Sequence, residues 1–422
     1  MNVKTFLAVA AGLALLPACS DKPSVPPSPL NMIIVAPGHF HAALPQKEML
    51  PGVSDTVRVF APEGPEVESY LSTVASFNGR DGNPTSWVEI ATVCPDFLDS
   101  LPRAGKGDFV VLAGNNVKKS EYILEAVKKG YNVLSDKPMA IDLGGYALIK
   151  EAYALAQENG LLVYDLMTER YDVLNAIVRE IVSSKDIFRN GVDSVSMQSV
   201  HHFYKNVAGS VLTRPQWYYD VTQQGEGIAD VTTHLVDLAL WQCFPGVPVK
   251  AEDVVLKGAS HYPTLLTLEQ FKASTGASRF PEFLSGSVKD GVLEVYSNGS
   301  ISFEARGVPV NIDVRWDFEA PKGAGDTYAA RISGRDAVLE IIQDEATGFV
   351  EQLYLTATEL TVAKVKECLA NSYPSANVIP SEEEPGRWLV DVKDADRPGH
   401  EEHFNVVAST FISYLEGAKV PE

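Results

Sequence analysis

The fold is decided by a stretch that reads Asp108-Phe109-Val110-Val111-Leu112-Ala113-Gly114-Asn115-Asn116 and resumes, after a helical segment, as Asn132-Val133-Leu134-Ser135-Asp136-Lys137-Pro138. Each part is a short apolar run that breaks into turn residues, which is typical of a strand buried on both faces. Residues 120–129 between them have helical character, and Gly130 follows as a helix C-terminal residue. Strand, helix and strand in this order predict a parallel sheet covered by helices.

The same alternation extends in both directions. It predicts strands at residues 31–35, 56–60 and 161–164, and helices at 67–77 and 145–158. Ligands of such sheets bind at the carboxyl ends of the strands. The breaks that follow the strands should therefore meet in one crevice, which would hold Gly38, Glu63, Asn115 and Lys137.

The pattern changes after about residue 190, and the chain becomes rich in strands from about residue 250. Asn298-Gly299, between two strand-like runs, predicts a hairpin turn. Helices are expected at 226–241 and 401–417. We predict an α/β protein, with a Rossmann-type, doubly wound parallel sheet at residues 31–165. An α+β domain for substrate binding and oligomerisation, with a mostly antiparallel open sheet, would occupy residues 166–422.

The N-terminus has the pattern of a targeting segment. Lys4 precedes an apolar run at residues 6–16, which is too short to span a bilayer. Leu16-Pro17-Ala18-Cys19 resembles a bacterial lipobox, in which the cysteine is lipidated after cleavage. Residues 1–19 would be the signal peptide and 20–30, rich in proline and serine, a tether. We expect an exported, lipid-anchored protein, periplasmic or outer-membrane-associated, that contacts the membrane only through its anchor; an ordinary cleaved signal peptide is the alternative.

Composition excludes some classes of partner. The chain of 422 residues, long enough for two domains, has a formal net charge of -20, so a nucleic-acid backbone would repel it. Three cysteines besides Cys19 are spaced too widely for a zinc site or a disulfide framework. His400 and His403 lack an obvious third ligand. We therefore predict no metal.

The first turn of the parallel sheet is the candidate phosphate-binding turn. A GxGxxG frame falls on Ala36, Gly38 and His41, so only one of its three glycines is present. Glu63 follows the second strand, where a carboxylate would accept hydrogen bonds from a ribose diol. Such a carboxylate would favour NAD over NADP, although Glu63 could equally be a solvated loop acid.

Three residues have the chemistry for proton transfer. Lys137 lies at the mouth of the sheet before a proline, where partial burial would lower its pKa. Asp230 and His234 are four positions apart and would share one helical face, where the carboxylate could orient the imidazole. A surface lysine, a helix-end acid and a core histidine are the alternative interpretation.

With these motifs the chain resembles the glucose–fructose oxidoreductase and inositol dehydrogenase family, Gfo/Idh/MocA. The family pattern D-A-V-V-I-A-T-P-N, A-G-K-H-V and E-K-P is similar to residues 108–116, 129–133 and 136–138. The family's G-G-G-x-x-x-D-x-x-x-H is similar to residues 225–234. The resemblance covers about residues 32–241. It departs at Ala36, at His41, at Lys119, where many members have histidine, and at Glu226, which interrupts the triple glycine.

The resemblance implies roles for single residues. Lys137 would be the catalytic lysine beside the nicotinamide, His234 the acid/base on the substrate hydroxyl, and Asp230 the residue that holds substrate and assists the histidine. It further implies sugar or inositol substrates and a homodimer or homotetramer. The residues that would contact the cofactor are Gly38, His39, Phe40, His41, Glu63, Gly114, Asn115, Asn116, Asp136, Lys137 and Pro138. For His39 and His41, a place facing the substrate or a contact with the second domain is the alternative.

Further polar and aromatic residues are candidates for the substrate cleft. His202 and Tyr204 end a strand of the second domain, and Trp217 and Tyr218 precede the glycine motif and could stack on a sugar face or simply pack.

The leading hypothesis is oxidation of a secondary hydroxyl of a sugar, glycoside or inositol, with a tightly held NAD. The alternatives are a redox-neutral glycosidase or lyase of the same superfamily, and a catalytically silent sugar-binding lipoprotein. The altered glycine turn favours the silent protein, whereas the presence of Lys137, Asp230 and His234 favours an enzyme.

Overall fold

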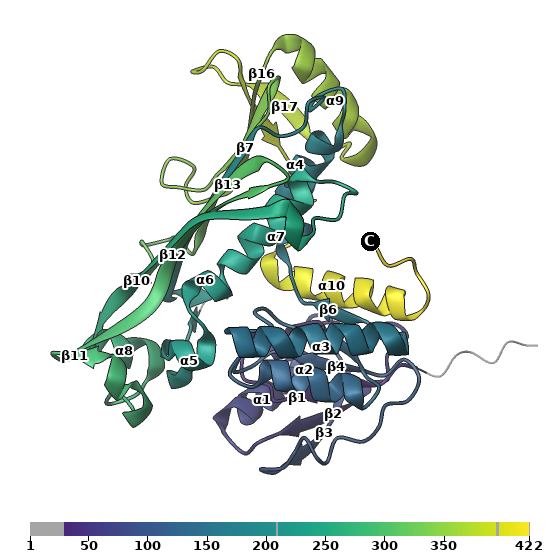
Figure 1. Ribbon diagram of the computed structural model, residues 1–422, viewed down its shortest axis with the longest axis vertical. Helices are drawn as coiled ribbons and strands as arrows, with labels where there is room; N and C mark the ends of the chain where they lie inside the picture. The colour runs from purple at the N-terminus through teal and green to yellow at the C-terminus, as the bar shows by residue number, and fades with distance from the viewer. Residues whose placement is uncertain (1–28, 208–209, 394–395, 422) are drawn as a thin grey trace, which may run out of the picture.

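Two sheets dominate the computed structural model, which describes residues 29–207, 210–393 and 396–421 (Figure 1). The sheet near the N-terminus is parallel, and its strand order is β3-β2-β1-β4-β5-β6. This is the doubly wound order of dinucleotide-binding folds. The second sheet is larger and mostly antiparallel. The predicted fold class is therefore confirmed.

Apolar residues buried on both faces build the first sheet. Its strands are β1 (Met32–Val35), β2 (Thr56–Ala61), β3 (Val88–Val93), β4 (Phe109–Leu112), β5 (Asn132–Ser135) and β6 (Val163–Asp165). Every residue of β1, β4 and β5 is buried. Successive side chains alternate between two cores, so that Ile33 packs on one face and Ile34 on the other.

Helices cover both faces of this sheet. One face carries α2 (Lys119–Lys128) and α3 (Leu143–Asn159). Helix α3 begins where the Asp142 side chain accepts the Gly145 N–H and ends at Gly160, which has a φ of 64°. The other face carries α1 (Pro65–Gly79), whose first turn contains Pro65 and two glutamates, as the helix dipole favours.

The connection from β1 to β2 contains no α-helix. Two short 3₁₀ segments, η1 (Phe40–Ala42) and η2 (Leu44–Gln46), stand where a dinucleotide fold usually has its first helix. The Gly38 and His39 N–H groups both donate to the Ala113 carbonyl, at 3.0 and 3.2 Å. The first turn is thus bonded to the end of β4.

Long strands form the second sheet, in the order β10-β12-β13-β7-β14-β15-β16-β18-β17. Strands β13 and β7 are parallel, whereas the other pairs along this order are antiparallel. The strands are β7 (Ser194–Tyr204), β10 (Val254–Thr267), β11 (Val288–Lys289, which pairs with β12), β12 (Val292–Ala305), β13 (Val308–Glu319), β14 (Thr327–Ser333), β15 (Ala337–Ile342), β16 (Gln352–Ala357), β17 (Asn377–Pro380) and β18 (Arg387–Asp391). A separate pair consists of β8 (Asn206–Val207) and β9 (Ser210–Val211).

The remaining helices mostly accompany the large sheet. They are η3 (Glu169–Tyr171), α4 (Val173–Ser183), η4 (Gln216–Tyr219), α5 (Val221–Gln224), α6 (Gly227–Asp230), α7 (Thr232–Cys243), η5 (Ala251–Asp253), α8 (Leu268–Thr275), η6 (Glu282–Ser287) and α9 (Glu359–Ser372). The helix expected at 226–241 is divided in two at Val231, between α6 and α7.

The last helix, α10 (His400–Leu415), packs on the first sheet, whereas the predicted domain boundaries assign it to the second domain. Phe404, Val407 and Phe411 lie in the same core as Ile34 and Val59. In Figure 1 the yellow helix lies beside the parallel sheet. Residues 39–50 supply no α-helix to cover this face of the sheet. The apolar side of α10 therefore covers it instead.

The hairpin predicted at Asn298-Gly299 is wrong, because β12 runs through both residues. The Asn298 amide donates to the Tyr262 carbonyl at 3.1 Å and accepts the Trp316 N–H at 2.7 Å, so it links two neighbouring strands. A Cβ on Gly299 would lie 2.8 Å from Ile228 of α6. Here the Asn-Gly pair marks a bulged register and a close helix contact, not a turn.

The signal peptide, Cys19 and most of the tether lie outside the described residues. Among the helices that the structure describes, none has the length and apolar character needed to cross a membrane.

Candidate active site

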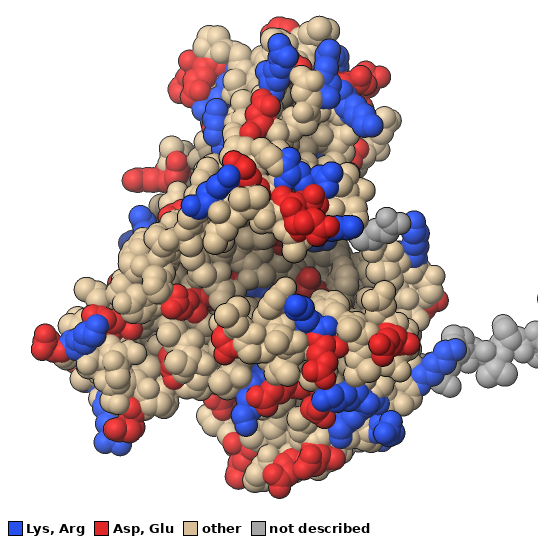
Figure 2. Space-filling model, viewed as in Figure 1, with Lys and Arg blue, Asp and Glu red and all other residues tan. Residues whose placement is uncertain are grey.

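Two cavities lie where the parallel sheet faces the large sheet, and Figure 2 shows a hollow between these two parts of the molecule. The first has a volume of about 620 Å³ and is lined by Lys137, Asp230 and His234. The second, of about 770 Å³, lies between the first turn, α1 and residues 212–218. His39 and Phe40 line both cavities, which therefore meet at the first turn.

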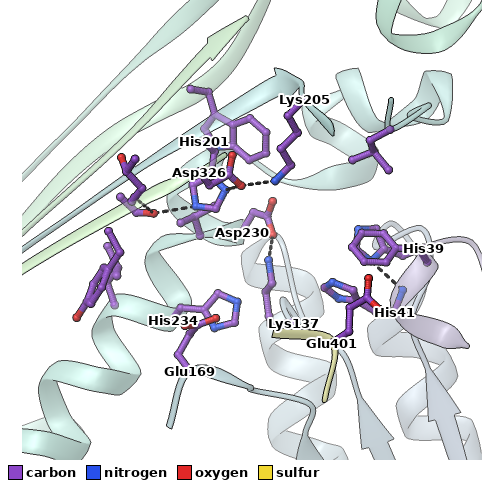
Figure 3. A pocket seen from close by; sticks show the side chains of 18 of the residues that line it. His39, His41, Lys137, Glu169, His201, Lys205, Asp230, His234, Asp326 and Glu401 are labelled. Carbon is purple, nitrogen blue, oxygen red and sulfur yellow. Dashed lines mark hydrogen bonds and ion pairs between the residues drawn. The ribbon is translucent and has the colours of Figure 1, made fainter. Parts of the chain in front are cut away.

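An ion pair between Lys137 and Asp230 lies at the centre of the first cavity (Figure 3). Lys137 follows β5, and Asp230 ends α6, so the two large parts of the chain each supply one partner. The other oxygen of Asp230 accepts hydrogen bonds from Gln224 at 3.1 Å and from Tyr218 at 3.5 Å. The carboxylate is thus held in one orientation.

Charge pairing outweighs burial at this pair. Burial alone would lower the pKa of Lys137, but Asp230 and Asp136 raise it above its ordinary value. Burial would raise the pKa of Asp230, and Lys137 instead holds it at about 2. The expected lowering of the Lys137 pKa is therefore wrong, because two carboxylates lie beside the ammonium. Near neutral pH the lysine is a proton donor and a fixed positive charge.

His234 and Glu169 are further groups on the wall of this cavity (Figure 3). His234 lies in the first turn of α7, and η3, which carries Glu169, packs against that helix. Burial, followed by repulsion from Asp172, raises the pKa of Glu169 to about 7. A carboxyl group with this pKa can give or take a proton at neutral pH.

The opposite wall carries a chain of polar contacts on the large sheet. His201 Nδ1 lies 2.9 Å from Asp326, and its Nε2 lies 2.8 Å from the Ser199 hydroxyl. Lys205 pairs with the same carboxylate. The His201 ring stacks on Trp316, with 5.0 Å between the centroids. Figure 3 shows His201, Lys205 and Asp326 across from Lys137.

Two glycines bring the first turn against the end of β4. A Cβ on Gly114 would lie 2.3 Å from the Ala36 carbonyl oxygen, and a Cβ on Gly38 would lie 3.3 Å from Gly114. Asn115 and Asn116 then turn toward the second part of the chain, where their amides donate to Gln223 and Gln224. These residues hold the two parts together at the rim of the cavities.

The chain shares sequence with known oxidoreductases. Residues 179–422 match the family model described as "Putative oxidoreductase C terminal domain". A crystal structure of a "putative oxidoreductase" from Parabacteroides merdae is 37% identical and superposes with a TM-score of 0.89, over 94% of this chain and 93% of that one. The chain belongs to this oxidoreductase family. No curated protein sequence gives a significant match.

More distant structures share the fold of this oxidoreductase. A levoglucosan dehydrogenase in complex with NADH and levoglucosan has a TM-score of 0.55 and 13% identity, over 93% of this chain and 91% of that one. A 3-ketoreductase from Actinomadura kijaniata in complex with NADP has a TM-score of 0.50 and 13% identity, over 92% and 90%. The fold is the one implied by the resemblance to the Gfo/Idh/MocA family.

Only two of the four further aromatic and histidine residues predicted for the substrate cleft line a cavity. Tyr218 lines both cavities, and Trp217 lines the second. His202 is buried behind the wall, because neighbouring residues of β7 point to opposite faces; His201 lines the cavity instead. Tyr204 stacks on Phe318, at 5.7 Å.

The carboxylate expected at the second strand is also displaced. Glu63 is exposed and, among the residues described, lines neither cavity, whereas Glu66 in the first turn of α1 lines the second. The loop after β2 is shorter than predicted, because β2 extends to Ala61 and α1 begins at Pro65. Glu66 therefore lies in the helix, and the helix brings a carboxylate to the cavity.

The motifs of the sequence assign no role to Glu169, Asp326 or Lys119. Glu169 follows β6, so the rule that sites lie after parallel strands would have found it. Asp326 lies in a loop before β14 with no motif around it. Lys119 is 2% exposed and donates to the Asp136 carbonyl at 3.1 Å, while burial lowers its pKa to about 8.

Proposed function

We propose that this oxidoreductase oxidises a secondary hydroxyl of a sugar, glycoside or inositol, with a nicotinamide cofactor. The observation that carries the proposal is the buried Lys137–Asp230 pair, which lies with His234 in a cavity of about 620 Å³ beside a second cavity. The first volume suits a monosaccharide or a small glycoside. The structures of similar fold that hold NADH or NADP lend support.

The second cavity fits a dinucleotide in place and size, although the first turn would hold it differently. Pyrophosphate usually binds N–H groups of this turn, but those of Gly38 and His39 already donate to Ala113. Ser69 and Thr213 line the cavity, and their hydroxyls would take this task, whereas the Thr73 hydroxyl already donates to the Ser69 carbonyl. The Glu66 carboxylate would accept hydrogen bonds from the ribose hydroxyls. Because it would repel a 2′-phosphate, it favours NAD over NADP.

The residues of the chain divide the chemistry among them. When bound, the nicotinamide supplies the acceptor for the hydride. His234 takes the proton of the substrate hydroxyl, because Asp230, with a pKa of about 2, is too weak a base. The Lys137 ammonium stabilises the negative charge that develops on the oxygen. Asp230 holds Lys137 in place and binds a neighbouring hydroxyl.

Glu169 favours a second candidate, the redox-neutral cleavage of a glycoside. There, transient oxidation acidifies a neighbouring C–H, a base removes that proton, and the glycosidic oxygen leaves. Glu169, with its pKa near 7, would protonate the leaving oxygen. Water would then add to the unsaturated ketone left by the elimination, and the hydride would return to the carbonyl carbon. Free sugar would form, and the cofactor would show no net change.

Cofactor binding tests the proposal first. We expect the purified protein either to carry nicotinamide absorbance or to bind added NAD, as seen by quenching of its tryptophan fluorescence. The absence of both signals at millimolar NAD would contradict the proposed redox function. The protein would then be a sugar-binding protein. Free sugar formed without reduced cofactor would identify the glycoside-cleaving alternative.

The N-terminal sequence completes the proposal. We infer that Cys19 carries a lipid that anchors the protein outside the cytoplasmic membrane. We further infer that copies of the chain associate through the exposed face of the large sheet into a homo-oligomer. Free dinucleotide is scarce there, so the cofactor would stay bound through turnover. Mass analysis of the membrane fraction, compared with Cys19→Ala, tests the anchor.

A further inference from the structure

A cluster of ligating side chains lies beside the Lys137–Asp230 pair, where the first turn meets the turn after β5. Asp136 Oδ2 lies 3.0 Å from His41 Nδ1 and 3.7 Å from His39 Nδ1. One ligand atom of each side chain lies within 4.8 Å of the other two. Asp136 and the two histidines are about a hundred positions apart in the chain, so no local spacing marked them.

This donor set suits a transition metal ion. Two imidazole nitrogens and one carboxylate oxygen are common ligands of Zn²⁺, which binds them at about 2.0–2.2 Å in tetrahedral geometry. Donors at these distances are roughly 3.3 Å from one another. The observed separations of 3.0 and 3.7 Å to Asp136 bracket that value, so small side-chain rotations would complete the geometry.

Asp136 and His41 are held in position by their neighbours, and the Nδ1 of His39 accepts the His41 N–H at 3.5 Å. Asp136 is 4% exposed, and its Oδ1 accepts the Lys137 N–H at 3.0 Å, which leaves Oδ2 toward the histidines. Lys119 donates to the Asp136 carbonyl and not to its carboxylate. The His41 ring packs on Phe404 of α10, with 4.5 Å between centroids. Such supporting contacts orient the ligands of metal sites in proteins.

One side of the cluster faces the substrate cavity. His39 and His41 both line the first cavity, and His39 also lines the second. Figure 3 shows both rings at the cavity edge, near Lys137. Three protein ligands with one open side are the arrangement of catalytic zinc sites, in which the fourth position holds water or substrate.

We propose that His39, His41 and Asp136 bind one divalent transition metal ion, with zinc preferred, and that its open position takes an oxygen of a polyhydroxylated ligand. The site shares no ligand with Lys137, Asp230 or His234, although Asp136 is bonded to the Lys137 N–H. Its occupancy does not depend on the proposed redox function. The proposal gives a role to the histidines that stand in a turn usually rich in glycine. Without a metal, the same three side chains would only bond the first turn to the turn after β5.

Metal binding by the whole protein tests the proposal directly. The protein is purified with an affinity tag that contains no histidine, treated with a chelator, and dialysed against Zn²⁺ before elemental analysis. We expect one zinc ion per chain. With Co²⁺ in its place, we expect visible absorption bands of a four- or five-coordinate nitrogen–oxygen site, a signal that needs no variant.

Two variants and a control locate the metal. His39→Gln and Asp136→Asn should each weaken zinc binding at least tenfold. His261→Gln is the matched control, because His261 is exposed and pairs with Glu226 elsewhere. Circular dichroism shows whether each variant is folded; if one is not, the Co²⁺ spectrum of the unaltered protein decides.

Two results would overturn the proposal. One is the absence of stoichiometric Zn²⁺ and Co²⁺ binding by the unaltered protein. The other is binding that persists in folded His39→Gln and Asp136→Asn, or that is lost in His201→Gln alone, which would assign the metal to the His201–Asp326 cluster. These measurements use neither NAD nor sugar, so their failure is distinct from a failure of the proposed function.

Discussion

Lys137 and Asp230 are 93 positions apart in the chain and form a buried ion pair between the parallel sheet and the large sheet. The pair fixes the protonation state of both groups, since each carries its charge at neutral pH. It also connects the two parts of the chain at the point where a substrate would bind. Its loss should therefore affect both catalysis and stability.

Removal of the lysine tests this double role. Lys137→Ala should lower kcat by about 10²–10³-fold, the usual loss of one charge-stabilising donor. It should also lower the free energy of unfolding by about 3–5 kcal/mol, because Asp230 is left buried without its partner. Urea unfolding and steady-state kinetics measure the two effects. Lys128→Ala, at an exposed pair with Glu125, is the control and should change neither.

The raised pKa of Glu169 predicts a pH dependence of stability. A carboxyl group whose folded pKa is about 7, against 4.5 normally, keeps its proton in the folded protein while the unfolded chain loses it. The stability should therefore fall as pH rises from 4.5 to 7, by at most about 3 kcal/mol from this group. Glu169→Gln should remove that part of the slope. An unchanged slope in Glu169→Gln would mean that Glu169 has an ordinary pKa.

Gly114 should tolerate no side chain. Gly114→Ala places a Cβ 2.3 Å from the Ala36 carbonyl oxygen, and the turns of β1 and β4 would separate. We expect the free energy of unfolding to fall by about 1–3 kcal/mol and NAD to bind more weakly. Gly79→Ala is the matched control, because nothing lies within 4 Å of the added atom. Equal stabilities of the two variants would contradict the close contact.

The two neighbouring histidines of β7 should behave differently. His201 lines the cavity, so His201→Gln should raise KM for a sugar or lower kcat by about tenfold or more. His202 lines neither cavity and meets the wall only through Asp326, 3.4 Å from its Nδ1, so His202→Gln should lower the melting temperature and change the kinetic constants of the folded protein less than His201→Gln does. The reverse pattern would show that the strand faces the cavity with the opposite set of residues.

The choice between NAD and NADP should depend on Glu66. Glu66→Gln removes the negative charge that would repel a 2′-phosphate. The dissociation constant for NADP should therefore fall by about tenfold relative to that for NAD. Glu63→Gln is the control, because Glu63 is exposed outside the cavity. Fluorescence titration with both cofactors measures the ratio. A change confined to Glu63→Gln would support the assignment made from sequence.

The sequence predicts the parts of this protein that depend on local patterns. The apolar runs of the parallel sheet and the helices between them follow from residues 108–138. The carboxyl ends of the strands place Gly38 and Lys137 at the cavities, but Glu63 and Asn115 line neither one. Lys137, Asp230 and His234 could be placed together because two motifs accompany them. All three line one cavity.

Features that depend on contacts between distant segments could not be predicted. Strand alternation shows that His201 and His202 face opposite sides, but it does not tell which side holds the cavity. Asn298-Gly299 favours a turn locally, and only the packing of Ile228 and the bonds to Trp316 make it part of a long strand. The direction of the Lys137 pKa shift depended on Asp136 and Asp230 together.

Transfer of a deuterium label tests the central claim most directly. The protein is incubated with NAD and a panel of methyl glycosides and inositols deuterated at the ring carbons, and the nicotinamide is analysed by mass spectrometry. We predict that deuterium appears on the reduced cofactor for at least one substrate and that Lys137→Ala abolishes the transfer. Binding of sugar and NAD by the folded protein with no transfer of deuterium from any substrate would contradict the account.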